Sequence, residues 1–217
     1  MSNSDSSIAP QGKTRRIPTS GWEYLSLAIM VGVIASVIYI ELQTQLIDSW
    51  AYDRSTFAVQ SWTAVSHALV HLNIQHMMLN VTALGCIFLL FRSAFHSLWW
   101  LVALAASAAS SAWGMYYYSP ETDWCVGMSG ALHGLFVYAA LRSRAHLLWI
   151  AAVAIKLLIE QQGLFDGQLL TEATAHFIAN PVVVDAHLWG VAGGFIVYGI
   201  ARTIAAIQLI IELNGDN

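Results

Sequence analysis

The segment Gly127-Met128-Ser129-Gly130 places a serine between two glycines at the start of an apolar run. A serine hydroxyl becomes an effective nucleophile when a neighbouring base accepts its proton. His187, in the segment Asp185-Ala186-His187, is the candidate base. A Ser-His pair is typical of acyl transfer. We therefore predict Ser129 as the nucleophile and His187 as the general base.

His76 and Asn80 are the candidate donors to an oxyanion. They are four residues apart, so on a helix they project from one face. Asn80 offers an amide N–H and His76 a ring N–H. The backbone N–H of Ser129 joins them, because the first turn of a helix has unpaired N–H groups at the positive end of its dipole. One such donor contributes about 3–4 kcal/mol to transition-state stabilisation.

The composition indicates a membrane protein. Hydrophobic residues make up 57% of the 217 residues and charged residues only 10%, whereas soluble domains carry about 25% charged residues. The net charge of −4 and the lack of a basic run predict no nucleic-acid partner. Cys86 lies within an apolar run, so a disulfide with Cys125 is not expected.

The apolar pattern predicts an all-α fold, a polytopic bundle of six transmembrane helices. The expected helices cover about 22–40, 70–91, 98–117, 129–141, 146–158, and 184 to past 200. Two external loops are expected at 41–65 and 161–181, the second containing Gly163, Gly167 and Pro181. The predicted organisation is a flexible tail (1–20), a membrane domain (21–213) and a C-terminal tail (214–217).

Basic residues predict the orientation, because they accumulate in cytoplasmic segments. With the N-terminus inside, the external loops hold only Arg54. The cytoplasmic segments hold Lys13, Arg15, Arg16, Arg92, Arg142, Arg144 and Arg202. Both termini are therefore expected in the cytoplasm.

Helix rise, about 1.5 Å per residue, then gives the depth of each candidate side chain. Counting from the basic residue that ends each helix, Ser129 and His187 lie about 20 and 22 Å from the cytoplasmic edge. His76 and Asn80 lie at about 24 and 18 Å, so all four share one level. A helix that begins at Ser129 inside the bilayer needs partners for its N–H groups, so the loop before it must line a wet cavity open to the outside.

Small residues predict how the serine and the histidine meet. Ala186, Gly190 and Gly194 are spaced by four and form a stripe beside His187. Gly130 and Gly134 repeat this spacing after Ser129. Such stripes let helix backbones approach closely. Close packing of the two helices would bring the His187 ring towards Ser129.

Together these motifs resemble the rhomboid intramembrane serine proteases. The matching residues are Gly127-x-Ser129-Gly130, His187 with Gly190 and Gly194, and His71-x-x-x-x-His76-x-x-x-Asn80. The resemblance implies a Ser129-His187 dyad, assistance to the oxyanion from His76 and Asn80, transmembrane protein substrates in the lipid bilayer, and no metal or cofactor.

The sequence also departs from the common rhomboid pattern. His133 stands where an aromatic residue, usually tyrosine, stacks on the catalytic histidine, and the first external loop lacks the Trp-Arg pair of many rhomboids. The extended motif from Gly127 to Gly134 and the Asp185-Ala186-His187 segment resemble the rhombosortase branch. That resemblance implies substrates with C-terminal Gly-Gly tails on exported proteins. It also implies a bacterial inner membrane, a site open to the periplasm, and an acyl-enzyme resolved by water or another amine.

Other roles stay open for the remaining polar residues. Lys156 lies near the level of Ser129 and could serve as its base, and Glu160, one turn on, can pair with it; both could instead contact substrate. His133 could orient His187 or bond to a loop. Asp185 points to another helix face than His187, which makes it a poor third triad member, but it could lie at the cavity rim. His67 and His71 share a face without an acidic partner, which favours structural hydrogen bonds over a metal site.

Two further functions remain as alternatives. A non-catalytic rhomboid-like protein would bind membrane helices without cleaving them. A transporter would use Lys156, Glu160 and the histidines, although the small size and the lack of a visible repeat argue against it.

Overall fold

The computed structural model describes residues 21–162 and 167–215. The predicted tail (1–20) with its three basic residues, Gly163, and residues 216–217 lie outside this part. Each predicted apolar segment is helical. The six long helices are α1 (Gly21–Glu41), α4 (Ile74–Leu90), α5 (Trp99–Tyr118), α6 (Ser129–Leu141), α7 (His146–Gln162) and α9 (Val184–Gly215). By length and composition, α1 and α9 can cross a membrane, and α4 and α6 are apolar but shorter.

Short elements occupy the connections between these helices. The first connection holds α2 (Leu46–Trp50), β1 (Tyr52–Asp53) and α3 (Thr63–Ser66), and further along the chain lie the 3₁₀ helix η1 (Arg92–Phe95), β2 (Trp124–Cys125) and α8 (Gly167–Ile178). The prediction of a loop throughout 161–181 was wrong over α8. One side of this helix lines an internal cavity through Thr171, Thr174 and Ile178, and the polar residues Glu172 and His176 are exposed on the other. The polar residues on its other face hid it among loop residues.

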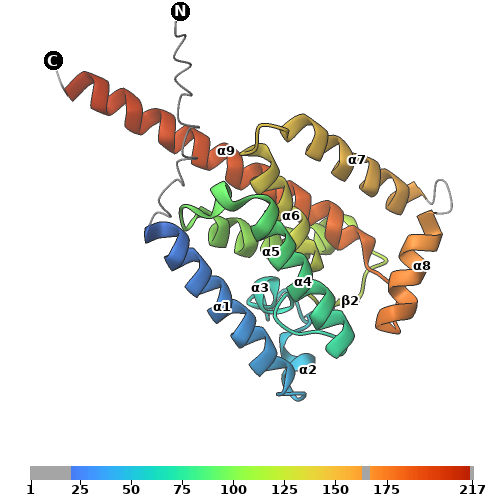
Figure 1. The fold of residues 1–217 in the computed structure, drawn as a ribbon. Coiled ribbons are helices and arrows are strands. Elements are labelled where there is room, and N and C mark those ends of the chain that lie inside the picture. The colour runs from blue at the N-terminus through green and yellow to red at the C-terminus, as the bar shows by residue number, and fades with distance from the viewer. Residues whose placement is uncertain (1–20, 163–166, 216–217) are drawn as a thin grey trace, which may run out of the picture.

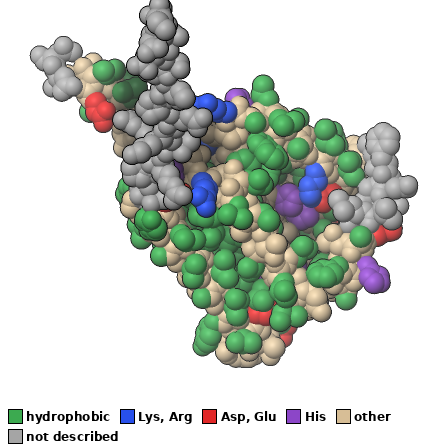
Figure 2. Space-filling model, viewed as in Figure 1, with side chains coloured by type: hydrophobic (Ala, Val, Ile, Leu, Met, Phe, Trp, Pro, Cys, Tyr) green, Lys and Arg blue, Asp and Glu red, His purple; other side chains and the backbone are tan. Residues whose placement is uncertain are grey.

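Helices α5, α6 and α9 pack against one another at the centre of the molecule (Figure 1). Helix α1 lies on one side of this centre, and α7 and α8 lie on the other. The visible outer surface is rich in hydrophobic side chains and has few charges (Figure 2). Val31, Leu89 and Leu148, for example, are 56%, 66% and 67% exposed. Soluble monomers rarely expose so much apolar surface, so these faces suit lipid, as expected of an all-α membrane protein.

Glycines bring the backbones of α6 and α9 together. A Cβ atom placed on Gly190 would lie 2.0 Å from the carbonyl oxygen of Gly130, and one on Gly194 would lie 2.1 Å from that of Gly134. Helix α5 closes the group from the other side, because the Ser111 hydroxyl donates to the Ala186 carbonyl at 2.7 Å. The predicted packing of two small-residue stripes is therefore confirmed.

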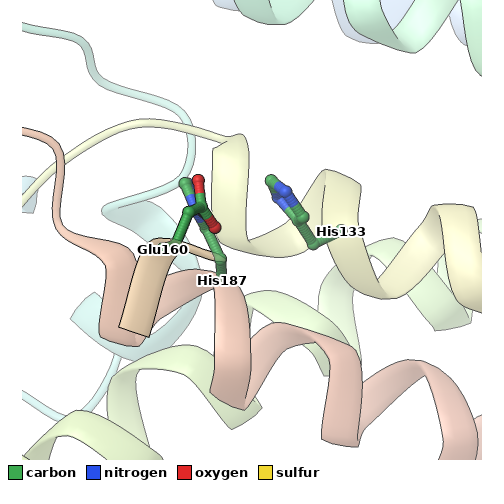
Figure 3. Close-up of side chains that lie close together, drawn as sticks. All are labelled: His133, Glu160 and His187. Atoms are coloured by element: carbon green, nitrogen blue, oxygen red, sulfur yellow. The ribbon is translucent and has the colours of Figure 1, made fainter. Parts of the chain in front are cut away.

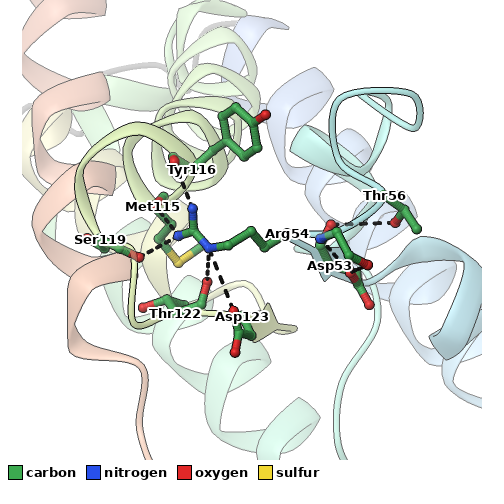
Figure 4. A network of polar contacts seen from close by, with 9 residues as sticks. Asp53, Arg54, Thr56, Met115, Tyr116, Ser119, Thr122 and Asp123 are labelled. Carbon is green, nitrogen blue, oxygen red and sulfur yellow. Dashed lines mark hydrogen bonds and ion pairs between the residues drawn. The ribbon is translucent and has the colours of Figure 1, made fainter.

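The segment that enters α6 is tied to the first connection. Strands β1 and β2 pair antiparallel, with Tyr52 opposite Cys125. Next to them, the Arg54 guanidinium donates to several backbone carbonyls at the end of α5 (Figure 4). Its acceptors are Met115 (2.7 Å), Tyr116 (2.8 Å), Ser119 (2.5 Å) and Thr122 (3.1 Å). Arg54 thus binds carbonyls around the end of α5, two of which (Met115 and Ser119) also accept a backbone N–H, and it fixes the loop that leads to β2.

Substitution of Gly190 by alanine should destabilise the fold. The added methyl group would collide with the Gly130 carbonyl, and such overpacking raises the free energy of the folded state by about 1–3 kcal/mol. Gly199→Ala is the matched control, because nothing lies within 4 Å of its Cβ position and alanine favours helix. Thermal unfolding in detergent would show a lower midpoint for Gly190→Ala alone. Equal midpoints for the two variants would contradict the packing argument.

Substitution of Arg54 by lysine should also destabilise the protein. A single ammonium cannot reach all four carbonyls, and we expect the free energy of unfolding to fall by about 2–4 kcal/mol. Asp123→Asn is the control: this carboxylate is 88% exposed and 3.8 Å from Arg54, so its loss should change stability by less than about 1 kcal/mol. Denaturation in detergent measures both. A larger effect at Asp123 would show that the ion pair, and not the carbonyl contacts, fixes this loop.

Candidate active site

Ser129 and His187 meet at the beginnings of two helices. Ser129 is the first residue of α6, and His187 lies in the first turn of α9. The Nε2 atom of His187 is 3.1 Å from the Ser129 hydroxyl oxygen, within hydrogen-bond distance. The His187 ring is only 4% exposed, whereas Ser129 is partly accessible from a cavity. The two predicted residues therefore lie in the geometry of a nucleophile and its base.

Gly127 shapes the turn into α6. Its φ of +108° is a conformation that side-chain-bearing residues rarely adopt. A Cβ atom here would lie 2.4 Å from the His76 ring, so the side chain is excluded for a second reason. The Gly127 N–H donates to the His67 carbonyl at 2.9 Å. The chain therefore turns sharply against His76 before it starts the helix at Ser129.

His76 and Asn80 project from one face of α4, as their spacing predicted. They are 7% and 3% exposed and line the same cavity as Ser129. The Asn80 amide donates one hydrogen to the His76 carbonyl at 3.2 Å, which leaves a second hydrogen available. Among the described residues, the Nδ1 atom of His76 has no hydrogen-bond partner, and no side chain caps α6. Several donors therefore remain free near Ser129.

An internal cavity connects these groups. Its volume is about 620 Å³, within the range of small-molecule and peptide side-chain pockets. Helices α4, α6, α7, α8 and α9 contribute to its wall. The wall is mainly apolar, and its polar members include the four residues that the depth argument placed at one level: His76, Asn80, Ser129 and His187. The structure thus brings the four residues together at one cavity, whereas their common depth in a membrane stays a prediction.

His133 stacks on the ring of His187. The two ring centres are 4.0 Å apart, and the planes are inclined by 20°. The Nδ1 atom of His133 lies 2.7 Å from the Ser129 carbonyl oxygen, one turn back on the same helix. The sequence left two roles open for His133, and the structure shows its contact with His187.

Glu160 is the member of the site whose role the sequence did not reveal. One carboxylate oxygen lies 3.1 Å from His187 Nδ1, and the other lies 2.5 Å from Lys156 Nζ (Figure 3 shows Glu160 with the two histidines). The pairing with Lys156 was predicted from the four-residue spacing, but the contact with His187 was not. Depth was the available signal, because Glu160 is 16 residues beyond Arg144, about 24 Å up and near the level of His187.

Lys156 and Asp185 do not contact the serine. The ammonium of Lys156 is held by Glu160, which disfavours it as the base for Ser129. Asp185 accepts a hydrogen bond from the Gln161 amide at 3.1 Å and lines a smaller, separate pocket. It is not among the residues that line the cavity of Ser129, and its hydrogen bond is to Gln161 and not to His187.

His67 and His71, the two histidines for which the sequence predicted structural hydrogen bonds, differ in their contacts. The Nδ1 atom of His67 lies 2.8 Å from the Thr63 carbonyl, a structural hydrogen bond of the predicted kind. The Nδ1 atom of His71 is 3.9 Å from the Glu41 carboxylate, an acidic partner from α1 that the helix spacing did not reveal.

The side chains around His187 could also bind a metal ion. His133, Glu160 and His187 offer ligand atoms within 4.8 Å of one another. However, both nitrogens of His187 already face partners, Ser129 and Glu160. In addition, nearly parallel stacked rings do not direct their in-plane lone pairs at one point. The observed geometry favours a hydrogen-bonded chain from Glu160 to Ser129.

Comparison with known proteins gives a family. The family model described as the Rhomboid domain matches residues 58–203, which is more than half of the chain and includes every residue of the site described above. No curated protein matches the sequence.

Proposed function

Because this membrane protein belongs to the rhomboid family, which comprises intramembrane serine proteases and also inactive members, we propose that it is an active protease of transmembrane substrates. The observation that carries the proposal is the 3.1 Å contact between His187 Nε2 and the Ser129 hydroxyl. Inactive members would need neither this contact nor the cavity of about 620 Å³ beside it.

The reaction follows from the positions of the side chains. The Ser129 oxygen attacks a substrate carbonyl carbon while its proton passes to His187 Nε2. The carbonyl oxygen becomes an oxyanion, which the Ser129 N–H and the His76 and Asn80 side chains stabilise. The intermediate then collapses: the C–N bond breaks, and His187 returns the proton to the leaving amine. Water, or another amine, attacks the acyl-enzyme with His187 again as base and releases Ser129.

The substrates are membrane-spanning segments cut near their outer end. The first turn of α6, where Ser129 lies, supports this, because its unpaired N–H groups require a cavity that water reaches from one side. In this proposal the protein lies in a bacterial inner membrane with six spanning helices, both termini in the cytoplasm and the site open to the periplasm. The predominance of basic residues in the predicted cytoplasmic segments supports that orientation.

A narrower substrate class is the C-terminal Gly-Gly tail of exported proteins. This part of the proposal is supported by the rhombosortase-like motifs around Ser129 and His187, including His133 in place of the usual tyrosine.

Labelling with a fluorophosphonate probe in detergent tests the activated serine. We expect wild-type protein to be labelled and Ser129→Ala to be unlabelled, because it lacks the nucleophilic oxygen. His187→Ala should lose at least about 100-fold in labelling rate, since acid–base assistance contributes about 10²–10⁴-fold. Ser55→Ala is the control, because this exposed loop serine should be irrelevant to labelling.

The same proteins should then be compared for cleavage of a transmembrane substrate that carries a Gly-Gly tail. Cleavage by wild type alone would support the proposal in full. A tail-binding activity that survives Ser129→Ala, with no cleavage by wild type, would favour the non-catalytic helix-binding alternative.

Substitution of His133 tests the stacked arrangement. His133→Phe keeps an aromatic face against His187 and should retain at least about a third of the wild-type labelling rate, whereas His133→Ala should lose about 3–10-fold, the value of one aromatic contact. The rate constant for fluorophosphonate labelling measures both. Wild-type rates in His133→Ala would show that His187 needs no support on that face.

A further inference from the structure

We propose that Glu160 is a positioning residue for His187, so that the site is a Ser-His-Glu triad and not a dyad. This inference rests on the proposed function and adds to it the group that orients the base. Helix α7 supplies the carboxylate, α9 the histidine and α6 the serine. The distance from the Glu160 carboxylate to His187 Nδ1 and the distance from His187 Nε2 to the Ser129 hydroxyl oxygen are equal, 3.1 Å each.

The carboxylate determines which nitrogen of His187 carries the proton. An ionised carboxylate only accepts hydrogen bonds, so the Nδ1 atom that faces Glu160 must carry the hydrogen. In a neutral imidazole the other nitrogen then has the lone pair. That nitrogen, Nε2, faces the Ser129 hydroxyl and is ready to accept its proton.

Two contacts at different parts of the ring hold His187 in place. His133 covers one face and limits tilting of the ring plane. Glu160 binds at the ring edge and limits rotation within that plane. Neither contact alone fixes both motions, so a stacking partner does not make the carboxylate redundant.

Lys156 makes a carboxylate tolerable at this depth. An isolated charge in the apolar region is expensive, and such groups are usually paired. Lys156 lies one turn before Glu160 and binds the oxygen that does not face His187. The Glu160 side chain is 11% exposed and that of Lys156 38%, so the ammonium lies on the open side of the pair. Glu160 can therefore stay ionised while it faces the histidine.

The next residue in the chain allows a purely structural role of Glu160 to be tested. Gln161 already links α7 to α9 through its 3.1 Å bond to Asp185, and this link does not touch the catalytic ring. If Glu160 only joined the two helices, loss of either link should have a similar effect. Gln161→Ala is therefore the matched control.

The test compares Glu160→Gln and Glu160→Ala with wild type, Gln161→Ala and Ser129→Ala. We expect both Glu160 variants to lose at least about 100-fold in kcat on a cleaved substrate, with KM within about twofold, because loss of the orienting acid in a serine triad acts on kcat. Gln161→Ala should keep the wild-type kcat. Fluorophosphonate labelling, which needs an activated serine but no bound substrate helix, should fall in parallel with kcat.

A double variant separates loss of the carboxylate from exposure of an unpaired ammonium. Glu160→Gln leaves Lys156 without its partner, which can itself harm folding. Lys156→Met combined with Glu160→Gln removes both charges, and it should fold with a thermal midpoint near wild type while keeping the loss in kcat. Recovery of kcat in the double variant would overturn the proposal.

The remaining outcomes are equally decisive. Wild-type kcat in both Glu160 variants, while Ser129→Ala is inactive, would overturn the triad and leave the protease function standing. Equal losses in Gln161→Ala would reduce Glu160 to a helix link. Loss of wild-type activity in a chelator, restored by Zn²⁺, would make Glu160 a metal ligand with His133 and His187. Cleavage that survives Ser129→Ala would instead overturn the proposed function itself.

Discussion

The structure depends on the close approach of two helix backbones. Helices α6 and α9 touch through glycines, with carbonyl oxygens of one helix occupying the space that side chains of the other would fill. Because Ser129 and His187 lie in the first turns of these helices, the separation of the helices sets the separation of the two side chains. An added methyl group at the contact would therefore move the base away from the nucleophile as well as strain the packing. Stability and catalytic geometry share one constraint.

The position at which α6 begins creates the second constraint. A helix that starts among apolar side chains presents N–H groups that have no partner. The segment before it must therefore turn without placing large hydrophobic side chains over these groups. Gly127 makes that turn against the His76 ring. The β1–β2 pairing and the Arg54 contacts hold the approach to it from the first connection. The N–H groups that a capping side chain would normally pair are therefore left facing a cavity, where they can bind a developing oxyanion.

The sequence predicted those parts of the site that depend on one helix at a time. The four-residue spacings of His76 with Asn80 and of Gly190 with Gly194 are local, and a rise per residue converts them into faces and depths. Contacts between α7 and α9 have no such local pattern, so Glu160 could be paired with Lys156 but not with His187. Arg54 was likewise counted as a charge for orientation, because its carbonyl acceptors lie more than sixty residues away. Helix α8 was missed since its polar face resembles loop composition.

Charge balance explains why a carboxylate, an ammonium and a histidine belong together in an apolar region. In the proposed reaction His187 starts neutral and the charges of Glu160 and Lys156 cancel, so the resting group carries no net charge. When Ser129 attacks in this proposal, His187 gains a positive charge and the substrate oxygen a negative one, and the total is again zero. The imidazolium forms against the Glu160 carboxylate, and the oxyanion forms near the positive end of the α6 dipole. Each new charge therefore appears beside a group of opposite sign that is already in place, so a low-dielectric environment strengthens the stabilisation and does not oppose the reaction.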